Sequence, residues 1–218
     1  MQQGETAMRI AIIGTGNVGS AIARGLKGKD HQLILGARDP QAADVAALAR
    51  DSGAVPMLPQ AAAQAGDVII LALPWGVAES AVKALGSLAG KTVIDCMNPL
   101  GMVGGSLGLT VGHSTSGAEI VQAWLPGARV VKTLNQVGAE MMAKNDHLPH
   151  RPVQFVAGDD APAKETAMAL LADLGFDALD AGDLTRARIL EPFAMVWINQ
   201  AILRGKGRDW AFAAVGGK

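Results

Sequence analysis

Short runs of apolar residues alternate along this chain with longer stretches in which apolar positions recur at helical spacing. The short runs are typical of buried β-strands, and the longer stretches are typical of helices that bury one face. The predicted strands are residues 8–13, 32–36, 54–57, 67–73, 91–95, 129–134 and 152–157. The predicted helices are residues 17–28, 40–52, 77–86, 117–124 and 161–174.

The predicted strands are apolar at almost every position rather than at every second one. Such runs are typical of parallel strands that helices cover on both faces. The alternation of strands and helices therefore predicts an α/β fold built on a doubly wound parallel sheet. We expect a loose extension at residues 1–7, one main domain at residues 8–182 and a C-terminal helical segment at residues 183–218.

Two segments depart from this alternation. Residues 183–204 have a helical pattern with no strand after it, and Pro192 within it should kink or divide the helix. Residues 101–117 are rich in glycine and follow neither period. Because a loop of this length inside a compact domain is more often functional than a plain connection, we expect a lid there.

Composition narrows the class of protein. The chain has 218 residues, of which 50% are hydrophobic and 18% charged, as in folded globular domains. The formal net charge is −1 and the basic residues are scattered, so we expect no nucleic-acid partner. Cys96 is the single cysteine, which excludes an internal disulfide. Since neither a signal pattern nor a membrane-spanning apolar run is present, we expect a cytoplasmic protein without a membrane partner.

A glycine motif follows the first predicted strand and opens the first helix. Gly14, Gly16 and Gly19 fit the spacing GxGxxG. Gly14 would permit a tight turn, Gly16 would let a pyrophosphate approach the backbone, and Gly19 would let helix and strand pack closely. The free N–H groups of the helix N-terminus favour phosphate. The sequence therefore predicts a dinucleotide-binding domain of the Rossmann type.

The end of the second strand bears on which dinucleotide binds. NAD enzymes usually place Asp or Glu there, whereas this chain has Ala37 and Arg38. A guanidinium can hold a 2′-phosphate through a planar, charge-assisted fork. Alternatively, Arg38 is a solvated surface residue paired with Asp39. Because the acidic residue is missing, we expect NADP rather than NAD.

Further candidate residues follow the later strands, where open α/β sheets bind ligands. They are Leu73, Pro74, Trp75, Asn98, Pro99, Thr133, Asn135 and Gln136. Trp75 is either a wall of the nicotinamide pocket or a core residue under the next helix. Asn135 either orients a carboxamide or a second cofactor, or forms a turn. Ser116 and Glu119 fit a helix-capping box.

Other chemistries find little support in the sequence. The four histidines lack metal-ligand spacing, no GxSxG elbow is present, and we expect Cys96 to be a buried apolar residue rather than a nucleophile. The chain has no tyrosine, which excludes a Tyr–Lys proton relay. A nicotinamide site without an evident acid suits a flavin-like acceptor that delocalises charge itself.

Several segments together resemble the NADPH-dependent reductases of the deazaflavin coenzyme F420. They are "MRIAIIGTGNVGSAIA", "LGARDP", "ILALPW", "STSGAEIVQAWLPGARVVKTLN", "VAGDD" and "DAGDLTRARILEP". The dinucleotide domain of that family is similar to that of STEAP-type metalloreductases. The resemblance runs from Met8 to about Gly205. It implies a Rossmann domain with a short helical C-terminal part, direct hydride transfer between stacked nicotinamide and deazaflavin rings, and homo-oligomers.

The resemblance also implies roles for individual residues. Thr15, Gly16, Asn17 and Val18 would hold phosphates, Arg38 the 2′-phosphate, Pro74 and Trp75 the nicotinamide side, and Asn98, Pro99 and Asn135 the facing pocket. This chain departs from the family at Ala37 and Ala42, where family members carry Ser and a further cation around the 2′-phosphate.

Three functions therefore stay open at this point. The first, which we favour, is a reductase that exchanges hydride between NADP(H) and coenzyme F420 or a flavin. The second is a reductase of a small imine or carbonyl, for which Thr133, Asn135 and Gln136 are the candidate proton donors. The third is a non-enzymatic redox sensor that binds NADP.

The C-terminal segment carries many large apolar side chains. They are Leu190, Phe193, Met195, Val196, Trp197 and Ile202. These side chains pack either on the sheet of their own chain or on a second subunit, which would make the protein a homodimer.

Overall fold

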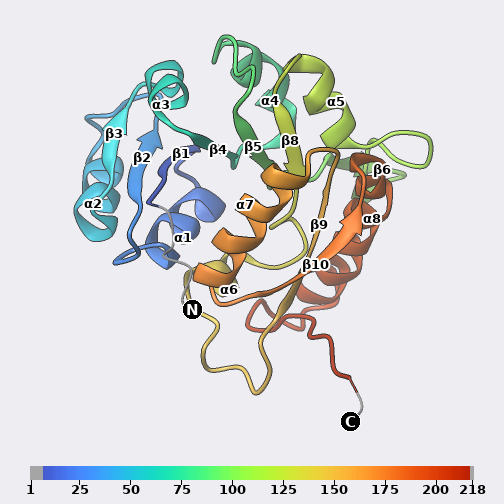
Figure 1. Cartoon of the computed structure of the whole chain (residues 1–218). Helices are drawn as coiled ribbons and strands as arrows, with labels where there is room; N and C mark the ends of the chain where they lie inside the picture. Colours follow the sequence, from blue (N-terminus) through green and yellow to red (C-terminus); the bar gives the residue numbers. More distant parts are fainter. Residues whose placement is uncertain (1–6, 217–218) are drawn as a thin grey trace.

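A computed structural model describes residues 7–216 as an eight-stranded sheet between two layers of helices (Figure 1). The strands are β1 (Arg9–Ile13), β2 (Gln32–Gly36), β3 (Val55–Met57), β4 (Val68–Leu71), β5 (Thr92–Asp95), β8 (Arg129–Lys132), β9 (Val153–Gly158) and β10 (Asp177–Gly182). All seven predicted strands are confirmed, and β10 is an additional strand. The predicted extension at residues 1–7 lies, apart from Ala7, outside the described residues.

The strand order is β10-β9-β8-β5-β4-β1-β2-β3, seen from right to left in Figure 1. The six strands from β8 to β3 are parallel, and β1 lies between β4 and β2. The chain thus winds in opposite directions from β1, which creates the crevice where α/β sheets bind ligands. The predicted doubly wound fold is confirmed.

One part of the parallel sheet was predicted wrongly. β9 runs antiparallel to β8, with Val131 opposite Gly158, and β10 runs parallel to β9. A parallel pairing needs a crossover that returns the chain to the other edge of the sheet. The connection between β8 and β9 contains only the short helix α6 (Ala139–Ala143), and β9 therefore starts at the carboxyl edge.

The helices divide between the two faces of the sheet, each with its own apolar core. α1 (Asn17–Gly25), α2 (Ala43–Ser52), α6 and α7 (Ala161–Asp173) contribute to one core. α3 (Pro59–Ala65), α4 (Trp75–Lys83) and α5 (Gly117–Trp124) contribute to the other. The five predicted helices of the main domain are confirmed in position, whereas α3 and α6 are too short to show a clear period.

A β-hairpin occupies part of the segment predicted as a lid. Antiparallel strands β6 (Leu100–Val103) and β7 (Ser106–Leu109) pair across a turn at Gly104 and Gly105, which have φ angles of 57° and 84°. Two glycines with positive φ are typical of tight hairpin turns. The glycines on the strands themselves hide the strand pattern in the sequence.

The C-terminal segment forms a 3₁₀ turn η1 (Leu184–Arg186), helix α8 (Ala187–Ile198) and a π-helical turn η2 (Asn199–Leu203). Pro192 does not divide the helix, which is continuous from Ala187 to Ile198. Trp197 and Ile198 pack with Leu100 and Leu107 of the hairpin and with Trp210 of the tail. Within residues 7–216, no helix has the length and apolar character that crossing a membrane requires.

Candidate functional site

The glycine turn joins β1 to α1 at the carboxyl edge of the sheet. Gly14 has a φ angle of +105°, and a Cβ there would collide with the carbonyl group of Ala72. A Cβ at Gly19 would collide with the carbonyl group of Gly14. Around Gly16, by contrast, no heavy atom of any other described residue apart from its two chain neighbours lies within 4 Å of the position a Cβ would take. Two glycines are therefore required by packing, and the third leaves open space above the turn.

The N-terminus of α1 is not capped by a side chain. Among the described residues, the N–H groups of Asn17, Val18 and Gly19 have no hydrogen-bond acceptor, and the first helical bond runs from Ser20 N to Gly16 O at 2.9 Å. Such a helix end attracts anions, because free N–H groups and the helix dipole point outward.

Other helices of the same sheet show what a capped end looks like. The Ser116 hydroxyl accepts a hydrogen bond from Glu119 N at the start of α5, which confirms the predicted cap, and Asp160 caps α7 in the same way. Because α2, α3, α4, α6 and α8 also start without a side-chain cap, the missing cap alone does not distinguish α1. What distinguishes the start of α1 is its place at the glycine turn, at the carboxyl edge of the sheet.

Arg38 lies just beyond the end of β2, beside the glycine turn. The two elements are joined by a hydrogen bond from Gly14 N to Gly36 O at 3.1 Å. Arg38 is exposed and forms no ion pair with any described residue. The Asp39 carboxylate instead accepts a hydrogen bond from Gln41 N at 2.9 Å. Arg38 therefore does not form the expected ion pair with Asp39, although it is exposed as a solvated surface residue would be, and its guanidinium group is available.

A groove of about 590 Å³ begins at the glycine turn and runs between α1, α2 and α6. Its size is in the range of small-molecule sites. Its polar lining includes Thr15, Asn17, Ser20, Arg24, Asp44 and Glu140.

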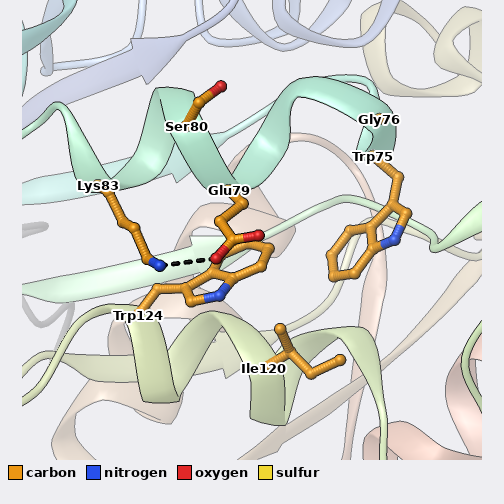
Figure 2. Close-up of a pocket in the computed structure, with 7 residues that line it drawn as sticks. All are labelled: Trp75, Gly76, Glu79, Ser80, Lys83, Ile120 and Trp124. Atoms are coloured by element: carbon orange, nitrogen blue, oxygen red, sulfur yellow. Dashed lines mark hydrogen bonds and ion pairs between the residues drawn. The ribbon is translucent and has the colours of Figure 1, made fainter.

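Leu73, Pro74 and Trp75 follow β4, as predicted, but the three side chains have different surroundings. The Trp75 ring stacks on Trp124 with ring centroids 5.5 Å apart and an angle of 27°. Figure 2 shows both rings beside a hollow between α4 and α5, where Glu79 and Lys83 form an ion pair of 2.6 Å. Trp75 thus links two helices, while Leu73 and Pro74 lie at the strand end itself.

Asn98 and Asn135 are brought together across the ends of β5 and β8. Asn98 Nδ2 donates to Asn135 O at 2.8 Å, and Asn135 Nδ2 donates to Asn98 Oδ1 at 3.0 Å. Asn135 Nδ2 also donates to Leu190 O at 3.2 Å, and its Oδ1 accepts from Gln136 Nε2 at 2.9 Å. Since both donors and the acceptor of Asn135 are used inside the protein, its amide is a brace between strand ends.

The two other candidate proton donors are also enclosed. Gln136 Nε2 donates to Phe155 O at 3.0 Å, and Gln136 Oε1 accepts from Phe155 N at 2.9 Å. The Thr133 hydroxyl is fully buried and has no partner among the described residues. Cys96 is buried as well, and burial raises the pKa of its thiol far above the usual range, which disfavours a thiolate.

Sequence reasoning missed a buried charge cluster formed by Asp95, Lys132 and Glu191. Lys132 Nζ lies 3.0 Å from Asp95 Oδ2 and 3.0 Å from Glu191 Oε1, and it also donates to the Met97 carbonyl oxygen. Burial alone lowers the pKa of Lys132, but the two carboxylates outweigh it and the net pKa is raised. Charged residues at the ends of strands predicted to be buried were the available signal, because such charges must be paired.

An ion pair between Arg188 and Glu119 was also missed. Arg188 Nε and Nη2 donate to the two carboxylate oxygens of Glu119 at 2.9 Å and 2.5 Å. Hydrogen bonding to Arg188 lowers the pKa of Glu119, and the Ser116 hydroxyl acts in the same direction. This pair fastens the start of α8 to the start of α5.

The doubly wound sheet, the glycine turn with its open helix N-terminus and the unpaired arginine after β2 define a dinucleotide-binding fold of the Rossmann type. Residues 9–99 match the family model described as NADP oxidoreductase coenzyme F420-dependent. An F420-dependent NADP reductase from Methanocaldococcus jannaschii is 31% identical over 209 residues, which cover 88% of this chain and 92% of that protein. The chain therefore belongs to the F420-dependent NADP reductase family and is an NADP-dependent oxidoreductase.

A solved structure and a second relative are also similar to this chain. The crystal structure of an Arthrobacter sp. FB24 protein, described as a candidate F420-dependent NADP reductase, has a TM-score of 0.87 and 31% identity over 96% of this chain and 100% of that one. The metalloreductase STEAP3 of Rattus norvegicus is 28% identical over 190 residues, or 85% of this chain. This chain spans only 36% of the length of STEAP3.

Proposed function

We propose that this protein transfers hydride between NADPH and the deazaflavin ring of coenzyme F420. The observation that carries the proposal is the pairing of an open α1 N-terminus with the unpaired Arg38, in a chain 31% identical to an F420-dependent NADP reductase. The first feature suits a pyrophosphate and the second suits the 2′-phosphate that distinguishes NADP from NAD.

On the NADP side, the residues present fit the dinucleotide. The open space at Gly16 and the N–H groups of Asn17 and Val18 would receive the pyrophosphate. Arg38 would hold the 2′-phosphate without help from Ala37 or Ala42, neither of which offers a hydroxyl or a charge. When bound, the nicotinamide supplies the hydride, and the protein residues fix its position against the second ring.

On the acceptor side, the residues at the strand ends can align the acceptor ring with the nicotinamide rather than transfer a proton to it. Leu73 and Pro74 would contact the nicotinamide, and Trp75, which stacks on Trp124, would hold this turn in place. Asn98 and Pro99 would line the pocket that faces the nicotinamide. Asp95 and Glu191 are committed to Lys132, and the Asn135 amide is satisfied internally. A ring that delocalises the transferred charge needs only this alignment, which favours a deazaflavin or flavin over an imine or carbonyl.

We also propose that residues 8–182 act as the dinucleotide domain and that residues 183–218 assemble two copies into a homodimer in the cytoplasm. Ile189 and Val196 lie seven residues apart on α8 and are 60% and 51% exposed, and Leu203 of the following π turn is 48% exposed. An apolar stripe of this kind is typical of a helix that packs against a partner. Light scattering of the purified protein tests this: a monomer mass at working concentration would contradict it.

The choice of acceptor is tested by mixing the protein and NADPH separately with oxidised deazaflavin, FMN, FAD and a cyclic imine. We expect rapid oxidation of NADPH with the deazaflavin and little with the imine. NADPH binding without oxidation by any ring acceptor would contradict the proposed function, and oxidation by the imine alone would favour reduction of C=N substrates.

A further inference from the structure

Lys132 is the largest fully buried side chain among the described residues, and all its donor capacity is used. Its ammonium contacts Asp95 Oδ2 and Glu191 Oε1, each at 3.0 Å, and the Met97 carbonyl oxygen. The side chains of Lys132, Asp95 and Glu191 are 1%, 0% and 1% exposed. An ammonium group has three donors, so this site is complete.

The cluster has two carboxylates for one ammonium, and backbone N–H groups offset the remaining negative charge. Glu191 Oε2 accepts from Gly117 N at 2.9 Å, and Glu191 Oε1 accepts from Ala118 N at 3.1 Å, both at the N-terminus of α5. Asp95 Oδ1 accepts from Met97 N at 2.9 Å. The cluster therefore joins β5, β8, α5 and α8 at one buried point.

Stability alone explains this arrangement poorly. Removing three charges from water is expensive, and well-packed apolar residues of similar volume often give equal or greater stability. What the cluster provides, and an apolar core would not, is directional contact with defined backbone atoms.

The contacts of Lys132 with Met97 and with Glu191 both connect it to the side chains of Asn98 and Asn135. The carbonyl group of Met97 directly precedes Asn98. Glu191 directly follows Leu190, whose carbonyl oxygen accepts a hydrogen bond from Asn135 Nδ2 at 3.2 Å. Asn98 and Asn135 in turn hold each other through two hydrogen bonds. None of these contacts of Lys132 with described residues reaches the glycine turn or Arg38.

We propose that Lys132 is a positioning residue for the acceptor pocket: by holding Met97 and Glu191, it sets the place of the Asn98–Asn135 pair relative to the nicotinamide side. This inference rests on the proposed function for the identity of the pocket. Lys132 touches no substrate, and its effect on hydride transfer passes through Asn98, Asn135 and the first turns of α8.

The variant Lys132→Met tests this, with Lys91→Met as a matched control. Lys91 also donates to three oxygens, the carbonyls of Ala63, Gln64 and Gly66 at 2.9, 2.7 and 2.6 Å, but it lies just before β5 at the opposite edge of the sheet. Because Lys132→Met leaves two buried carboxylates without a counter-charge, the neutral triple variant Asp95→Asn, Lys132→Met, Glu191→Gln is measured beside it. The triple variant keeps the side-chain volumes and removes the charge from the cluster.

For the folded Lys132 variants, we expect the hydride-transfer rate to fall, or the acceptor KM to rise, by about tenfold or more, with the NADPH Kd changed less than about twofold. Lys91→Met should leave all three quantities near those of the unmodified protein. Wild-type transfer and acceptor KM in the triple variant, or a parallel loss of NADPH affinity, would overturn the positioning role.

A second readout does not depend on the acceptor. The side-chain amide NMR signals of Asn98 and Asn135 should shift in the triple variant and stay in place in Lys91→Met. Unchanged signals would overturn the proposal directly. If the unmodified protein reduces no deazaflavin or flavin, the proposed function fails, while these signals still decide whether Lys132 positions the pair.

Discussion

Asn135 lies between Asn98 and the backbone of Leu190, donating to Asn98 Oδ1 at 3.0 Å and to Leu190 O at 3.2 Å. The Asn135 side chain, after β8, is thus hydrogen-bonded both to the residue that follows the neighbouring strand β5 and to the C-terminal helix α8. This relationship gives Asn135 a role in holding the crevice together, whichever molecule the crevice accepts.

We predict that Asn135→Ala lowers the free energy of unfolding by about 1–3 kcal/mol, because it leaves buried donors and acceptors without partners. Chemical denaturation measures this loss. Hydride transfer should decrease in the same variant, since α8 is no longer tied to the strand end. A variant with unchanged stability would show that water replaces the amide and that the brace is dispensable.

We predict that Arg38→Asp weakens NADPH binding by about tenfold to a hundredfold, which is the range for losing a charge-assisted contact to a phosphate. Binding of NADH should change far less, because it carries no 2′-phosphate. Fluorescence titration with both dinucleotides measures the difference. Equal loss for NADPH and NADH would remove Arg38 from the 2′-phosphate site.

Trp75→Ala separates the two interpretations of this tryptophan. If the ring supports the nicotinamide pocket, hydride transfer should fall by about tenfold or more, while adenosine 2′,5′-bisphosphate binds nearly as before. Trp124→Ala removes the stacking partner, 5.5 Å away, and serves as the control for helix packing. If both variants lose stability and neither loses transfer, Trp75 is a packing residue between α4 and α5.

The Glu119–Arg188 pair predicts a pH dependence of stability. Hydrogen bonding to Arg188 lowers the pKa of Glu119 in the folded protein. The pair therefore contributes stability above the unfolded pKa, and this contribution is lost as the pH falls through the lower folded value. Glu119→Gln should slightly lower the melting temperature at neutral pH, with a difference that shrinks in acid. A difference independent of pH would contradict the role of the charge.

Much of the fold could be predicted because its strands are uniformly apolar and because glycines that are close together in the sequence define a single turn. Gly14, Gly16 and Gly19 are close in sequence and fix one turn, so their spacing alone indicates it. The hairpin of β6 and β7 was missed because glycines interrupt its apolar pattern. The direction of β9 was missed because strand periodicity contains no information about direction.

The interior of the site could not be predicted, since its partners lie far apart along the chain. Asn135 meets Leu190, and Lys132 meets Asp95 and Glu191, only when the C-terminal helix packs against the strand ends. The sequence identified the residues at the crevice, but only the fold distinguishes those with free polar atoms from those already satisfied. Arg38 belongs to the first group and Asn135 to the second.

The most direct test of the account is a single-turnover reaction of the protein with NADPH deuterated at the transferable position and oxidised deazaflavin. Mass spectrometry then follows the deuterium. The account predicts that one deuterium appears in the reduced deazaflavin, because the two rings exchange hydride without solvent. Reduced deazaflavin without deuterium, or no reduction while NADPH remains bound, would contradict direct transfer between the two rings.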